Sequence, residues 1–211
     1  MRRKLGAFFL VFGFLLLLGA GGLYLYNREQ SDASLEFAAE VLPLLTDKIQ
    51  NSPAQTPDDS QDPESSQTLP FPGPEPQREM TVVELDGYYY IGILSIPAID
   101  YTAPIMADWS YSLLNISACR FSGSTFGDDL VICAHNYDGL NRSFVRLPVG
   151  SELQFTDMDG VVWRYTVASL ETLGDSQVEE MTESGYPLSF FTCNYGGETR
   201  LTLRCVAEEL N

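Results

Sequence analysis

Hydrophobic and polar positions divide the sequence into unlike parts, and the first part is entirely apolar. The run from Leu5 to Tyr26 carries no charged side chain. A helix of this length reaches about 33 Å, enough to cross a hydrocarbon core of about 30 Å. We therefore predict a transmembrane anchor at residues 5–26. A cleaved signal peptide is the alternative, but its apolar core is usually shorter, and bulky residues at 23–26 follow the glycines here.

The next two segments connect this anchor to the rest of the chain. Residues 27–50 place Leu35, Ala38, Val41 and Leu45 close to the spacing of one helical face. Pro43 interrupts the pattern, so we expect a short or kinked juxtamembrane helix. Residues 51–79 are rich in Pro, Ser, Gln, Asp and Glu, a composition that buries too little apolar surface to fold. We expect a disordered tether that holds a domain away from the membrane.

From residue 80 to 211 the pattern changes to short runs rich in β-branched and aromatic residues, separated by turns such as Asp159-Gly160. This pattern predicts a mostly β domain, closed or sandwich-like, with brief helices near 110–115, 140–147 and 176–184. The predicted strands are residues 90–96, 99–106, 118–122, 130–135, 152–156, 161–170, 188–193 and 200–207.

The distribution of charged residues predicts how the chain is oriented in the membrane. The chain has 12 Lys and Arg against 29 Asp and Glu, a net charge of −17. Such a balance argues against nucleic-acid partners, which require clustered cations. Arg2, Arg3 and Lys4 precede the apolar run, whereas every acidic residue follows it. Because flanking cations stay on the cytoplasmic side, we expect residues 1–4 in the cytoplasm. The chain would then cross the cell membrane once, with the β domain outside the cell.

Metal and cofactor chemistry has little support in the sequence. A single histidine, His135, excludes sites built on a histidine pair. The acidic pairs lack the alternating ligand spacing of a calcium-binding loop, so we read them as solvated surface charge. We expect no cofactor, and Ca²⁺ remains only a weak candidate for these pairs, Asp128-Asp129, Asp157/Asp159 and Glu179-Glu180.

Three residue types with complementary chemistry stand at strand ends. His135 follows an apolar run, Cys193 ends another, and Arg200 opens the next strand after a short turn. If these ends lie side by side, they supply a nucleophile, a proton carrier and an oxyanion partner. Arg204 alternates onto the same strand face as Arg200 and is the second choice of arginine.

The other cysteines suit a hydrophobic core. Cys205 alternates with Leu201 and Leu203 on one strand face, and Cys119 and Cys133 lie in apolar runs. An extracytoplasmic location permits disulfides. If Cys193 stays free, at most one bond is left, with Cys119–Cys133 and Cys133–Cys205 both conceivable.

Together these motifs resemble the sortase family. The resemblance rests on Ile-Gly-Ile-Leu-Ser-Ile-Pro at 91–97, on Ala134-His135 with Phe144 and Leu147 after it, and on Phe191-Thr192-Cys193 followed by Arg200. Sortases are membrane-anchored cysteine transpeptidases of Gram-positive surfaces. The resemblance implies an eight-stranded β-barrel with short helices, preceded by the membrane helix and tether.

The sequence departs from the family pattern at several points. Sortases commonly carry Thr-Leu-x-Thr-Cys, but residues 188–193 keep only the final Thr-Cys. The residue before the histidine is often Gly and is Ala134 here. No Asp-Pro-aromatic lid occurs in the tether, and the nearest echo, Asp108-Trp109, lies inside the domain. These differences leave the sortase subclass open.

The resemblance also implies roles and partners. Cys193 would cleave a LPxTG-like sorting signal through a thioester, with His135 as proton carrier and Arg200 stabilising the oxyanion, supported by Thr192 and the Asn194 backbone N–H. Its partners would be surface or pilin proteins that carry the signal, and an amine nucleophile of a peptidoglycan precursor or a pilin. The alternative is a non-catalytic, membrane-tethered β domain that binds wall or peptide ligands.

Overall fold

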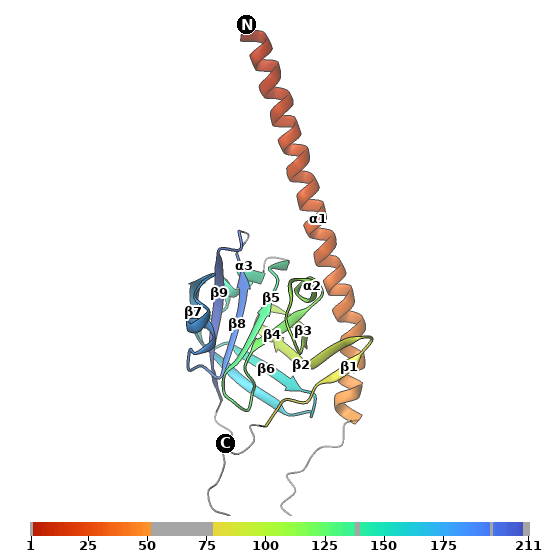
Figure 1. Ribbon diagram of the computed structural model, residues 1–211, viewed down its shortest axis with the longest axis vertical. Helices are drawn as coiled ribbons and strands as arrows, with labels where there is room; N and C mark the ends of the chain where they lie inside the picture. The colour runs from red at the N-terminus through yellow and green to blue at the C-terminus, as the bar shows by residue number, and fades with distance from the viewer. Residues whose placement is uncertain (1, 52–77, 138–139, 195, 209–211) are drawn as a thin grey trace, which may run out of the picture.

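The computed structural model describes residues 2–51, 78–137, 140–194 and 196–208. A long N-terminal helix lies against a β-barrel that carries short helices in its connections (Figure 1). In chain order the elements are α1 (Arg2–Asn51), β1 (Val83–Leu85), β2 (Tyr88–Ile96), the 3-10 turn η1 (Pro97–Ile99), β3 (Tyr101–Met106), α2 (Tyr111–Leu114), β4 (Ala118–Ser122), β5 (Leu130–Ala134), α3 (Leu140–Arg146), β6 (Glu152–Asp157), β7 (Val162–Gly174), α4 (Val178–Thr182), β8 (Leu188–Cys193) and β9 (Thr199–Ala207).

The strands close into a barrel. Their order is β1-β2-β3-β4-β5-β8-β9-β7-β6, and β6 pairs with β2 as well. The β2–β6 pairing closes the eight strands from β2 through β9 into a ring, and β1 stays outside it as the hairpin partner of β2. Strands β3–β4 and β5–β8 run parallel. The predicted eight-stranded barrel with short helices is confirmed.

Most strand boundaries agree with the sequence pattern, and two of the differences have clear causes. Strand β7 continues to Gly174 because β9 pairs with it along that whole length, up to Thr199. The short strand β1 was missed, although Asp86 and Gly87 after it both adopt positive φ angles of 52° and 82°. An Asp-Gly pair with this geometry is a hairpin turn signal.

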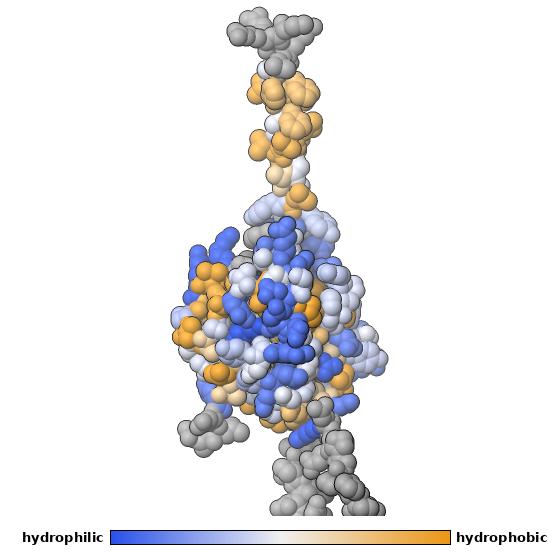
Figure 2. All heavy atoms as spheres, turned by 60° about the vertical axis from the view of Figure 1, so that its left-hand side comes forward, coloured by the Kyte–Doolittle hydropathy of each residue, from blue (hydrophilic) through white to orange (hydrophobic). Residues whose placement is uncertain are grey.

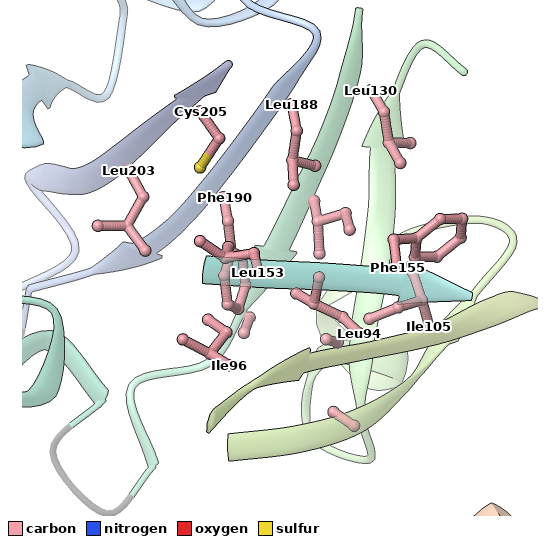
Figure 3. Close-up of a cluster of buried hydrophobic side chains, with 14 of the residues drawn as sticks. Leu94, Ile96, Ile105, Leu130, Leu153, Phe155, Leu188, Phe190, Leu203 and Cys205 are labelled. Carbon is pink, nitrogen blue, oxygen red and sulfur yellow. The ribbon is translucent and has the colours of Figure 1, made fainter. Parts of the chain in front are cut away.

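Alternation along the strands separates the barrel interior from its outer face. Along β5, Leu130, Ile132 and Ala134 belong to the interior cluster, whereas Val131 and Cys133 belong to a second, outer cluster. The interior is filled by aliphatic and aromatic side chains from all sides of the barrel (Figure 3). The packed interior fixes the position of each strand, whereas outward-facing side chains at the strand ends are not part of that packing. The outer face can therefore provide reactive groups.

Helix α1 covers part of the outer cluster. Its residues Val41 and Leu45 are buried there, and Phe37 and Ile49 pack beside them. The short helix expected at 27–50 is instead part of α1, which continues through Pro43; a helix kinked at Pro43 stays a prediction. A helical proline costs about 3 kcal/mol. Burying each large apolar side chain contributes about 1.5–3 kcal/mol, which offsets that cost.

The two halves of α1 have opposite surroundings. The first half is apolar and exposed, from Phe8 to Tyr26 (Figure 2). By length and composition it can cross a membrane, with a mean hydropathy of 2.3 over its most apolar window. The second half packs on the barrel. The position of the barrel relative to the apolar half therefore depends on α1 rather than on the predicted tether, most of which (52–77) lies outside the described residues.

Candidate active site

The strand register brings the three predicted site residues together. Cys193 lies directly opposite Arg200 in the β8–β9 pair. Ala134, the residue before His135, lies opposite Thr192, the residue before Cys193. His135, Cys193 and Arg200 consequently line one cleft of about 410 Å³. The C-terminal ends of β5, which His135 follows, and of β8, which carries Cys193, point toward the apolar half of α1 (Figure 1).

Arg200 is available for an anion. Its Nη1 donates to the Gly174 carbonyl oxygen at 3.2 Å, and its guanidinium carbon lies 5.9 Å from the centroid of the Phe191 ring. Within the described part of the chain it forms no ion pair with a carboxylate. A guanidinium has five N–H donors, so Arg200 keeps donors that can face a negative charge developing next to Cys193.

His135 has the surroundings of a proton carrier. It is exposed at the cleft surface, and its ring meets that of Tyr137 edge to face, with centroids 4.4 Å apart. Partial burial of the ring lowers the pKa of His135 below its ordinary value. The imidazole is thus mostly neutral near pH 7, where it can accept a proton on one nitrogen while the other already carries one.

The structure does not support the roles expected for Thr192 and Asn194. Thr192 is fully buried and lies outside the cleft lining, because its side chain alternates to the face opposite Cys193. The Asn194 N–H donates to the Thr199 carbonyl oxygen at 2.8 Å. The Asn194 side chain in turn accepts from the Thr199 N–H at 3.3 Å. Asn194 therefore fixes the β8–β9 turn, and its N–H is not free to reach an oxyanion.

The structure adds an aromatic wall that the sequence analysis missed. Trp109 lies 5.9 Å from Tyr111 and 5.2 Å from Phe121, and Phe121 meets Phe191 edge to face at 5.3 Å, between ring centroids. All four rings line the cleft. Tyr111 is 81% exposed. In the sequence, the available signal was the pair Trp109 and Tyr111 in a polar segment, because exposed aromatic residues often mark binding sites.

Arg204, the second choice of arginine, is structural. It is only 2% exposed and pairs with the Glu171 carboxylate. Its remaining donors reach Ser189 Oγ at 2.7 Å and the carbonyl oxygens of Glu180 and Met181 at 2.6 and 3.1 Å. With its charge compensated and its donors occupied, Arg204 has nothing to offer a substrate.

Exposure separates Cys193 from the other cysteines. All four are free thiols, and only Cys193 is partly exposed. Burial raises the pKa of Cys119 and Cys205 to about 12, and raises that of Cys133 as well. Buried thiols of this kind are unreactive. The prediction that these three cysteines are core residues is confirmed, and the conceivable disulfides are not formed.

Among the acidic pairs, Asp157 is not a solvated surface charge. It is 3% exposed and accepts hydrogen bonds from the N–H groups of Asp159 and Val161 and from Trp163 Nε1. Its carboxylate organises the β6–β7 turn. No group of three or more His, Cys, Asp or Glu that could hold a metal ion occurs among the residues described in the structure.

The sequence and the fold both have relatives among known proteins. The sequence matches the family described as Sortase domain over residues 94–208. The chain is similar to sortase C1 of Streptococcus agalactiae, with a TM-score of 0.50, 18% identity and coverage of 61% of this chain and 72% of that one. It is also similar to the Clostridium perfringens sortase D5 transpeptidase, with a TM-score of 0.48, 16% identity and coverage of 57% and 79%. A search of curated proteins found no match.

Proposed function

The chain belongs to the sortase family, and from that premise we propose that it is a membrane-anchored transpeptidase that cleaves a LPxTG-like sorting signal through a thioester on Cys193. The proposal rests on the cleft in which Cys193, the one partly exposed thiol, lies opposite Arg200, next to the chain's single histidine. Arg200 has no carboxylate partner in the described part of the chain. Nucleophile, oxyanion partner and proton carrier are the groups that acyl transfer needs.

In the first half-reaction His135 takes the thiol proton of Cys193, and the sulfur attacks the carbonyl carbon of the peptide bond between the last two residues of the signal. The carbonyl oxygen becomes an oxyanion, which the Arg200 guanidinium stabilises. As the C–N bond breaks, His135 gives a proton to the departing amine. The products are a thioester on Cys193 and a peptide with a new amino terminus. Since the Asn194 N–H is bonded to Thr199, Arg200 is the main oxyanion partner.

In the second half-reaction an acceptor amine attacks the thioester carbonyl. His135, now neutral, removes a proton from the attacking nitrogen as the new C–N bond forms. The C–S bond then breaks and returns the sulfur of Cys193. The donor is thereby joined through an amide bond to the acceptor, which we propose is a peptidoglycan precursor or a pilin.

The location follows from α1. We propose that its apolar half crosses the cell membrane once, with the basic cluster at residues 2–4 on the cytoplasmic side. The barrel then lies outside the cell. The donors are surface or pilin proteins that carry the sorting signal.

Capture of the acyl-enzyme tests the function. The full chain in detergent micelles is incubated with a library of LPxTG-like peptides, and intact mass is measured before and after adding an amine. We expect a mass increase equal to the N-terminal peptide fragment, located on Cys193 and released by the amine. Binding without a covalent adduct would favour the alternative of a non-catalytic binding domain.

A further inference from the structure

A second cavity lies next to the cleft, between α1 and the barrel. Its volume is about 310 Å³. One wall is α1, which contributes Ser31, Ser34 and Ala38, and the other walls come from the barrel and the loops around it. Among the described residues, three line both this cavity and the cleft: His135, Ala134 and Leu114. His135 is therefore the one group with acid–base chemistry that faces both spaces.

The lining of the second cavity mixes hydroxyl and apolar side chains. Among the described lining residues, seven carry a hydroxyl and eight are apolar, Asp100 supplies the one carboxylate, and there is no Lys or Arg. Four of the hydroxyls have partners: Ser34 Oγ donates to the Ile116 carbonyl oxygen at 2.9 Å and Ser117 Oγ to that of Pro104 at 2.7 Å. The Thr102 hydroxyl pairs with Ser95 Oγ at 3.2 Å, and the Tyr137 hydroxyl donates to Asn115 at 3.4 Å. A ligand that fits this lining presents N–H groups or a positive charge.

Ser31 gives independent support for a ligand. Its side chain lines the cavity and is 3% exposed, and its Oγ has no hydrogen-bond partner among the described residues. Buried hydroxyls almost always have a partner, because an unsatisfied one costs about 1–3 kcal/mol. Rotation of the Ser31 side chain toward the cavity would let a bound molecule with a polar group satisfy it.

From these observations, and resting on the function proposed above, we propose that this cavity binds the acceptor, an amine-bearing peptide. The acyl part of the donor must occupy the cleft, because Cys193 and Arg200 are there. The acceptor nitrogen must meet His135, which removes its proton. A cavity that shares His135 with the cleft lets the amine reach the Cys193 thioester past His135, and its described lining has no Lys or Arg to repel an ammonium group.

The cavity also makes α1 part of the enzyme. The acceptor would lie against the helix just beyond its apolar half, since Ser31 follows Tyr26 by little more than one helical turn. Burial and the Tyr26 phenol raise the pKa of Tyr137, which lines the cavity. The acceptor would thus be bound only by a protein that retains its N-terminal helix, and next to the predicted membrane surface.

Two neighbouring alanines on α1 provide a matched test. Ala38 lines the cavity, whereas Ala39 does not and is exposed. Ala38→Leu fills the cavity, and Ala39→Leu adds the same side chain outside it. Both keep helix propensity high. The full chain in detergent is acylated with a donor peptide found as above, and deacylation is then measured with triglycine and with hydroxylamine, an amine too small to need a binding site.

We expect Ala38→Leu to lower kcat/KM for triglycine by about 10- to 100-fold through misplacement of the acceptor. Acylation and deacylation by hydroxylamine should be unchanged in Ala38→Leu, and every rate should be unchanged in Ala39→Leu. Equal triglycine rates in the two variants would overturn this inference while leaving the proposed function intact. Failure of the unsubstituted protein to form any acyl-enzyme would overturn both.

A second variant changes the barrel side of the cavity and leaves α1 untouched. Asp100 has a positive φ of 52°, a conformation that Asn also tolerates, so Asp100→Asn removes the charge without straining the backbone. We expect the KM for triglycine to rise severalfold and to become less sensitive to salt, with acylation unchanged. An unchanged KM and salt dependence would contradict the proposal that this carboxylate attracts the ammonium group of the acceptor.

Discussion

Strands β8 and β9 carry two similar pairs of residues in different surroundings. Cys193 lies opposite Arg200, and on the same outer face Ser189 lies opposite Arg204. Each pair sets a small sulfur or oxygen side chain against a guanidinium. Cys193 and Arg200 line the cleft, and we call them the open pair. Ser189 and Arg204, the closed pair, are buried, and Arg204 Nη1 donates to Ser189 Oγ at 2.7 Å.

Burial and neutralisation make the difference between the two pairs. Arg204 has a carboxylate partner in Glu171 and two backbone carbonyl acceptors, whereas Arg200 has a single carbonyl acceptor in Gly174. An arginine whose charge is already compensated holds the structure together. An arginine with unused donors beside a thiol can instead stabilise negative charge that develops during a reaction. Residue type alone therefore does not show which arginine keeps donors for a ligand.

The largest expected effect comes from the sulfur of the open pair. Cys193→Ala should reduce acyl-enzyme formation by about 10⁴-fold or more, because no other group can form the covalent intermediate. Its unfolding midpoint should stay close to that of the unsubstituted protein. Intact mass spectrometry and thermal unfolding measure the two quantities. The matched change in the closed pair, Ser189→Ala, should preserve acylation and lower stability instead.

The arginine of the open pair comes next. Arg200→Gln should lower kcat/KM for the donor peptide by about 10²- to 10³-fold, the cost of losing an oxyanion donor. The free energy of unfolding should change by less than about 0.5 kcal/mol, since few contacts are lost. Peptide cleavage assays and urea unfolding test this. A large loss of stability with normal kinetics would place Arg200 in the same structural class as Arg204.

The arginine of the closed pair should show the reverse. Arg204→Met should destabilise the barrel by about 3 kcal/mol, because buried carbonyl acceptors lose their donor while Glu171 stays partly solvated. The fraction that remains folded should keep its kcat. Urea unfolding followed by fluorescence measures the stability, and active-site titration with a thiol reagent normalises the rate. A folded, stable but inactive Arg204→Met protein would refute the division between the two pairs.

The smallest expected effect concerns the pH dependence of the proton carrier beside the open pair. Since partial burial lowers the pKa of His135, its NMR titration midpoint should lie below the ordinary value of about 6.5. As the pH falls through that ordinary value, the unfolded chain then binds more protons than the folded chain, so His135 makes the protein less stable on acidification. His135→Gln should remove this contribution. A midpoint above about 6.5 would contradict it.

Much of the architecture could be predicted because its signals are local. The strands 118–122 and 188–193 were predicted at the bounds that the structure shows for β4 and β8, since alternation and turn residues lie in the segment itself. The same alternation placed Cys205 in the core. The candidate residues His135, Cys193 and Arg200 were also found from their positions at strand ends, and the family resemblance reinforced that choice.

The errors concern hydrogen bonds and faces that depend on partners far along the chain. Thr192 was assigned to the site because it precedes Cys193, yet adjacent residues of a strand face opposite sides. The Asn194 N–H was assigned to an oxyanion, but the turn to Thr199 uses it. Asp157 was read as surface charge, although Trp163 from the next strand binds its carboxylate.

The sequence by itself determined an apolar anchor segment, a β domain rich in short strands, and a thiol, an imidazole and two guanidinium groups at strand positions. Each of these follows from composition and periodicity over a few residues. Only the tertiary structure decided that Arg200 rather than Arg204 keeps free donors, that α1 packs on the barrel, and that His135 stands between two cavities. These outcomes depend on strand register and on packing between segments distant in the chain, where burial and neutralisation by a partner fix what each side chain can do.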